Sequence, residues 1–206
     1  MKLNKITGKT QWSIDQENSE IGFNVKHLMI TYIKGEFKTF NASIFTSGRG
    51  FGTTEINLWI STYSITTNNV KRDRHLKSSD FFDIKNNRQI TFKSRTIGRS
   101  VVKGDYNMWG ELTMMGVSRI IKLNIHLRGI ITDRSGHKRA AFTVTGIINR
   151  SDWGLTWNSI TESGSMVISD EVEILCEIEV TNKIHSEPET QSEFGDDNRK
   201  TLWQLL

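Results

Sequence analysis

The chain has 206 residues, of which 36% are hydrophobic and 24% charged. This composition predicts one folded domain with a buried core, and it excludes a disordered or collagen-like polymer. The formal net charge of +4 is spread along the chain, which argues against a nucleic-acid partner, and the single cysteine, Cys176, excludes an internal disulfide.

No targeting or membrane-spanning segment is visible in the sequence. The N-terminal MKLNKITGKTQW lacks the apolar core of a secretory signal, and no run approaches the roughly 18 apolar residues of a membrane span. We therefore expect a cytoplasmic protein without stable membrane insertion, or a periplasmic one if a signal has been removed.

The N-terminal region predicts strands. Thr10–Asp15 and Glu20–Lys26 alternate and are joined by polar QENS, which is typical of a hairpin. Tyr32–Phe45 changes parity between Phe37 and Phe40, and this change predicts a bulge of the kind that bends barrel strands.

The segment Asn68–Ser79 predicts the one helix, because NNVKRDRHLKSS lacks strand alternation and opens with asparagines suited to an N-cap. Its four basic side chains are candidate contacts for an anionic or polar ligand head: Arg72, Arg74, His75 and Lys77. The alternative is structural, with Asp73 and Asp83 pairing with neighbouring bases to close the helix on the barrel.

The rest of the chain to residue 181 alternates between apolar and polar residues. The expected strands are Glu55–Ser61, Ile90–Ile97, Tyr106–Met115, Ser118–Thr132, Ala140–Asn149 and Ser165–Thr181. Two are unusually long: in Ser118–Thr132 the apolar odd positions run from Ile121 to Ile131. At about 3.4 Å per residue such strands reach roughly 50 Å, against about 17–20 Å for a typical strand. They predict a tall, closed sheet whose interior accepts an elongated apolar ligand.

Several segments, in order, resemble one family: WSIDQENSEIGFNVKHLMI, RDRHLKSSDFFDI, ITFKS, GELTMMGVSRIIKL, RSDWGLTW and SDEVEI. They are similar to the YceI-like family of lipocalin-like, polyisoprenoid-binding proteins over residues 12–181. The resemblance implies an all-β, antiparallel barrel of about eight strands that binds, transports or sequesters a long-chain lipid: an isoprenoid quinone, a polyprenyl chain or a fatty acid or amide. It implies no cofactor other than such a bound lipid, no catalysis and a possible homodimer, for which the outward Trp59 is a candidate contact. Residues 1–181 then form the barrel domain.

Residues 182–206 lie beyond the family pattern. Their acid-rich composition predicts a solvated tail. The alternative is a docking segment that uses the apolar residues of the terminal LWQLL.

Inward parity predicts the ligand-binding residues, each of which could instead pack the core. They are Phe23, Val25, Phe37, Leu58, Ile60, Phe92, Tyr106, Met108, Leu112, Leu123, Ile125, Leu127, Phe142, Val144, Ile148, Val172, Ile174 and Cys176. In RSDWGLTW we expect Trp153 and Trp157 to close one barrel end, with Arg150 and Asp152 holding the loop by hydrogen bonds.

Two other function classes stay open. A barrel enzyme acting on a lipid-like substrate would need inward polar groups, and Ser94, Thr96 and Tyr106 are the candidates. The third class is a stress-related protein that acts through partners. Catalytic motifs are absent from the sequence, and the five histidines lack ligand spacing, so we expect neither catalytic residues nor a metal site.

Overall fold

The computed structural model describes residues 8–48, 50–159 and 167–182, which form antiparallel strands and one α-helix. The strands are β1 Lys9–Ile14, β2 Glu20–His27, β3 Thr31–Phe37, β4 Phe40–Ser47, β5 Glu55–Ser61, β6 Ile65–Thr66, β7 Gln89–Arg99, β8 Asp105–Met114, β9 Val117–Thr132, β10 Lys138–Asn149 and β11 Ile168–Asn182. The helix α1 is Val70–Leu76, and the short 3₁₀ helices are η1 Thr62–Ser64 and η2 Arg150–Trp153. A helix long and apolar enough to cross a membrane is not found in these ranges.

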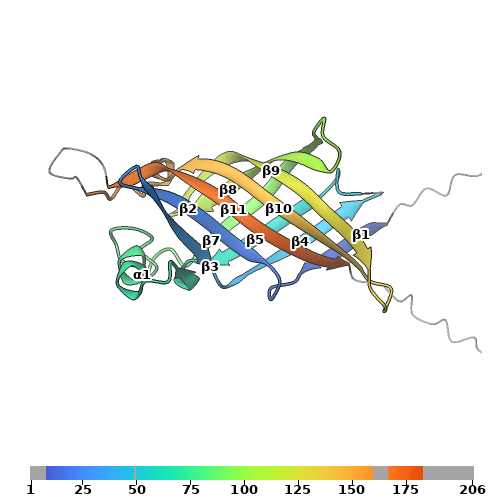
Figure 1. The fold of residues 1–206 in the computed structure, drawn as a ribbon, viewed down its shortest axis with the longest axis horizontal. Helices are drawn as coiled ribbons and strands as arrows, with labels where there is room; N and C mark the ends of the chain where they lie inside the picture. The colour runs from blue at the N-terminus through green and yellow to red at the C-terminus, as the bar shows by residue number, and fades with distance from the viewer. Residues whose placement is uncertain (1–7, 49, 160–166, 183–206) are drawn as a thin grey trace, which may run out of the picture.

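The sheet closes on itself as an eight-stranded barrel. Neighbouring strands follow the order β1, β4, β5, β7, β8, β9, β10 and β11, and β11 returns to β1 through Trp12 opposite Asn182 and Ile14 opposite Val180 (Figure 1). Every pairing in this ring is antiparallel. The all-β antiparallel barrel with a single helix is therefore confirmed.

The predicted hairpin between the first two strands is wrong. β1 and β2 do not pair with each other, because both run along the same edge of β11, with Ile14 opposite Val180 and Glu20 opposite Glu177. Between them the Asp15 carboxylate accepts the backbone N–H groups of Glu17 and Asn18. A hydrogen bond from the Asn18 side chain lowers the pKa of Asp15, so the charged form favours this turn. The segment between β1 and β2 therefore bends the chain along β11 and does not reverse its direction.

The predicted strand Tyr32–Phe45 is divided into two at the place where its parity changes. β3 ends at Phe37 and β4 begins at Phe40. β3 pairs with β2 and β6, whereas β4 pairs with β1 and β5. The break lets the wall turn, so that β2, β3 and β6 extend the barrel at the end where α1 lies (Figure 1).

The two long strands are present, but a bulge limits their alternation. β9 has 16 residues and β11 has 15. Opposite Ala141 and Phe142, the β9 partners jump from Gly129 to Leu127, so one extra residue reverses the pleat. Ile131, expected on the dry face, is consequently 64% exposed.

Candidate ligand cavity

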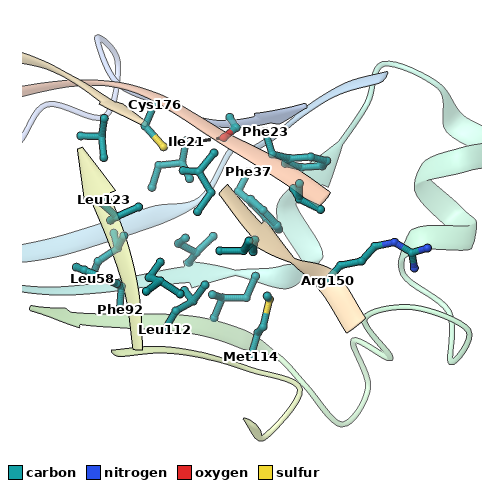
Figure 2. Close-up of a pocket in the computed structure, with 18 of the residues that line it drawn as sticks. Ile21, Phe23, Phe37, Leu58, Phe92, Leu112, Met114, Leu123, Arg150 and Cys176 are labelled. Atoms are coloured by element: carbon teal, nitrogen blue, oxygen red, sulfur yellow. Dashed lines mark hydrogen bonds between the residues drawn. The ribbon is translucent and has the colours of Figure 1, made fainter. Parts of the chain in front are cut away.

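The barrel encloses a cavity of about 700 Å³. Apolar side chains from all around the wall point into it, and Figure 2 shows Ile21, Phe23, Leu58, Phe92 and Leu123 among them. A cavity of this size lies in the range of small-molecule sites. The alternation of the strands therefore produces an apolar lumen, and side chains leave part of it unfilled.

The structure brings together all the predicted lining residues except Leu127. Leu127 pairs with Phe142 and is half-buried against the core, but it is not among the residues that line the cavity. Contact of the other residues with a ligand stays a prediction.

Sequence reasoning also missed part of the lining. Strand alternation could have predicted some of these side chains. They are Ile14, Ile21, Ile44, Ile56, Ile90, Ile121, Ile178 and Val180. Others come from loops and turns, where alternation gives no signal: Phe51, Phe81, Phe82, Leu155 and Trp157.

A cluster of aromatic rings closes the barrel end opposite α1. The ring centroid of Phe51, in the β4–β5 turn, lies 5.0 Å from that of Trp12 and 4.8 Å from that of Phe142. All three side chains are buried, and Trp12 Nε1 donates to Thr46 Oγ1 at 3.0 Å. These three rings therefore fill the lumen at this end of the barrel.

The α1 end carries the charged part of the lining. Lys71, Arg72, His75 and Arg150 line the cavity there, and the lining, taken over the residues that the structure describes, includes no Asp or Glu. Two of the four predicted head-group residues are thus at the cavity. The other two are not: Arg74 is exposed, and the Lys77 ammonium lies 4.6 Å from the ring centroid of Tyr63.

The structural alternative for this segment is wrong about the partners of Asp73 and Asp83, since neither forms an ion pair with a base among the described residues. Asn69 caps α1 by accepting the Arg72 N–H at 3.0 Å. Asp73 accepts hydrogen bonds from Thr66 and Thr67, not from a base. Burial opposes the charge of Asp73, but these hydrogen bonds outweigh it and hold its pKa below the usual value. Asp83 accepts from Asn86.

Arg150 fixes the loop that follows β10. Its side chain is only 7% exposed. Nε donates to Ser169 O at 3.0 Å, and Nη1 donates to Trp157 O at 2.9 Å and to Leu155 O. Burial lowers the pKa of this guanidinium, although Asp170 partly offsets the effect. Figure 2 shows the guanidinium directed away from the apolar cluster, so Arg150 holds the cavity wall in place.

The remaining expectations for RSDWGLTW hold in part. Asp170, not Asp152, secures the start of this loop, because it accepts from Ser151 N at 3.0 Å and Ser151 Oγ at 2.7 Å. Trp153 is buried behind the cavity wall and donates to Leu112 O. Trp157 lines the cavity, and its ring centroid lies 4.5 Å from His75 and 5.1 Å from Phe81. Trp157 therefore joins the loop to the α1 region.

Gly35 leaves room for the tip of the Phe23 ring. A Cβ at Gly35 would lie 2.3 Å from Cζ of Phe23, its cross-strand partner. We expect Gly35→Ala to push the Phe23 ring into the lumen, to cost about 1–3 kcal/mol of stability and to weaken ligand binding. Gly98→Ala is the matched control, because its Cβ meets open space. Equal affinities of the two variants, measured by titration with a long-chain amphiphile, would contradict this placement of Phe23.

Cys176 is a thiol in the cavity wall. Burial raises its pKa to about 12, so the protonated form dominates near neutral pH. At pH 8 the thiolate fraction is then about one in ten thousand. We expect a thiol reagent to modify the folded protein at least about a hundredfold more slowly than the urea-unfolded protein. Comparable rates in both states would show that Cys176 is accessible.

A closed antiparallel barrel around one apolar cavity is the architecture of the lipocalin-like binding proteins. The YceI-like domain matches residues 12–180 of this chain. The chain belongs to the YceI-like family.

Known relatives agree with this placement. A UPF0312 protein of Staphylococcus epidermidis is 31% identical over 164 residues, which cover 79% of this chain and 92% of the relative. The crystal structure of the Campylobacter jejuni YceI protein is 31% identical, with a TM-score of 0.67 over 77% of this chain and 90% of that one. A polyisoprenoid binding domain from Saccharophagus degradans shares the fold at 19% identity, with a TM-score of 0.57 over 84% of this chain and 98% of that one.

Proposed function

We propose that this protein binds an amphiphile with one long hydrocarbon chain inside the barrel, and that it carries or sequesters this lipid. The observation that carries the proposal is the continuous apolar cavity, plugged at one end and polar at the other. The candidate ligands are isoprenoid quinones, polyprenyl chains and fatty acids or amides. The description of the Saccharophagus degradans domain as polyisoprenoid binding supports the same class.

Burial of the hydrocarbon chain supplies the binding energy. At about 0.8 kcal/mol per buried methylene, eight carbons contribute roughly 6 kcal/mol before ordering costs. Because this term is not directional, the shape of the lumen selects chain length and girth. The polar groups near α1 are left to select the head group.

Two of the three polar side chains that a barrel enzyme would need inside the cavity do not line it. A register shift in β7 between Ser94 and Thr96 turns Thr96 outward, where it is exposed. Ser94 Oγ accepts the Ile56 N–H at 2.8 Å, and neither Ser94 nor Thr96 lines the cavity. Tyr106 alone remains in the lining. The geometry therefore favours binding over catalysis.

The test begins with protein purified from its own cells. Native mass spectrometry should reveal a bound mass, and organic extraction should recover a long-chain lipid. Delipidated protein should regain stability with that lipid by RT ln(1 + [L]/Kd), about 2.7 kcal/mol at a hundredfold excess over Kd. The proposal fails if nothing copurifies and no quinone, polyprenyl phosphate, fatty acid or fatty amide raises the Tm.

The position of the cations gives a prediction about head groups. Lys71 lines the cavity, whereas Lys77 lies over Tyr63. We expect Lys71→Gln to weaken binding of a fatty acid anion by up to about fivefold and to leave binding of the matching neutral amide unchanged, since a solvated ion pair is worth about 0–1 kcal/mol. Lys77→Gln should change neither affinity. Titration at fixed ionic strength checks both, and an equal loss for acid and amide would show that Lys71 shapes the entrance without sensing charge.

A further inference from the structure

The turn between β2 and β3 exposes three consecutive apolar residues. Leu28, Met29 and Ile30 form its tip, and Met29 and Ile30 are 68% and 83% exposed. The tip is fixed, because Leu28 N donates to Val167 O at 2.8 Å and Ile30 N donates to His27 O at 3.1 Å. An exposed apolar cluster of this kind marks an interaction site.

This tip lies at the α1 end of the cavity. His27 and Ile33, which flank the tip, line the cavity, as do Asn69 and Lys71 on either side of Val70. Val70 is itself 77% exposed at the start of α1. Figure 1 shows the β2–β3 turn and α1 at the same end of the barrel. Two apolar projections from separate segments therefore lie beside the end through which a ligand would enter.

Basic residues surround these projections. They are Lys26 and Lys34 beside the turn and Lys71, Arg72 and Arg74 in α1, and among the described residues none of them is paired with a carboxylate within 4.0 Å. Acids also lie at this end, and several of them are hydrogen-bonded within the protein. Asp170 accepts from Ser151, Glu173 accepts from the Tyr32 hydroxyl, and Asp80 lies 2.9 Å from His75 Nε2. The end of the barrel is thus apolar at its tips and cationic around them.

We propose that the barrel docks with this end on an anionic phospholipid bilayer. Met29 and Ile30 insert among the lipid head groups, and the lysines and arginines beside the turn and in α1 contact the phosphates. Protruding apolar side chains encircled by cations fit a bilayer interface, where apolar groups enter the acyl boundary and cations remain at the phosphates. The docked orientation turns the cavity entrance toward the membrane, so a lipid passes between bilayer and barrel without crossing water. Docking goes beyond lipid binding and is measurable with delipidated protein.

Flotation with vesicles tests the proposal. Delipidated full-length protein is mixed with vesicles of phosphatidylcholine alone, or of phosphatidylcholine containing roughly one third phosphatidylglycerol. We expect binding to the anionic vesicles that falls as salt is raised. Met29→Ser/Ile30→Ser should weaken this binding at least tenfold. The control Ile130→Ser/Ile131→Ser removes two exposed isoleucines of β9, near the opposite end, and should bind like wild type.

Three results would overturn the proposal. One is the absence of wild-type binding to anionic vesicles, and another is equal binding by the two double variants. The third is a dimer in sedimentation that Met29→Ser/Ile30→Ser dissolves while vesicles bind neither form, which would assign the turn to a second copy of the chain. Uptake of detergent-dispersed lipid by Met29→Ser/Ile30→Ser should match wild type, and this readout separates a failure of docking from a failure of lipid binding.

Discussion

Replacing Ile125 with tryptophan is expected to abolish ligand uptake while the barrel stays folded. Ile125 lies near the middle of β9, is buried, and pairs with Tyr106 on one side and Val144 on the other. All three residues line the cavity. The added indole would enter space left for the ligand. We expect at least a tenfold loss of affinity, about 1.4 kcal/mol, with a stability cost at or below the 1–3 kcal/mol of overpacking a filled core.

Asn124→Trp is the control for this variant. Asn124 precedes Ile125 on the same strand and is exposed on the outer face, so its replacement adds the same bulk outside the barrel. Titration and urea unfolding of both variants check the prediction. Normal binding by Ile125→Trp would contradict the assignment of the lumen, and so would its unfolding while Asn124→Trp remains folded.

Arg150→Met is expected to destabilise the protein by about 3 kcal/mol or more. The variant keeps much of the apolar stem but leaves the carbonyls of Leu155, Trp157 and Ser169 without their donor. Each buried group left unsatisfied costs about 1–3 kcal/mol, and relief of the desolvated charge returns only part of this. Urea unfolding measures the change.

Arg128→Met provides the comparison for Arg150. Arg128 is solvent-exposed on β9 and forms an ion pair with Glu177 at 2.9 Å, so its loss should cost no more than about 1 kcal/mol. Equal losses from the two variants would show that the buried guanidinium does not hold the loop.

Strand alternation was enough to predict the barrel and most of its lining. In β9 the pattern from Ile121 to Ile125 places every apolar side chain inward, as the structure has it. The pattern fails after an extra residue enters the ladder: beyond Arg128 in β9, where Ile131 is exposed, and beyond Arg95 in β7, where Thr96 is exposed. A bulge is defined by the partner strand, and the alternation of one strand alone does not contain that information.

The wrong prediction that β1 and β2 form a hairpin has a similar cause. β1 and β2 have the local pattern of a hairpin, but pairing with β11, far along the sequence, makes them continuous. The cations of α1 could be predicted as a group, yet only the fold shows that Arg72 lines the cavity and that Arg74 does not. The composition also did not predict that the ring of Phe51 would pack with other aromatic rings at one end of the barrel.

The most direct test of lipid binding in the lumen is an isotope-filtered NOE experiment between a ¹³C-labelled long-chain fatty amide and the methyl groups of the delipidated protein. β9 and β10 carry isoleucine and valine on both faces: Ile125 and Val144 line the cavity, whereas Ile120 and Ile147 are exposed outside. We predict NOEs from the ligand chain to Ile125 and Val144 and none to Ile120 and Ile147. NOEs confined to the outer methyl groups, or no NOE to any lining methyl at saturation, would contradict binding inside the barrel.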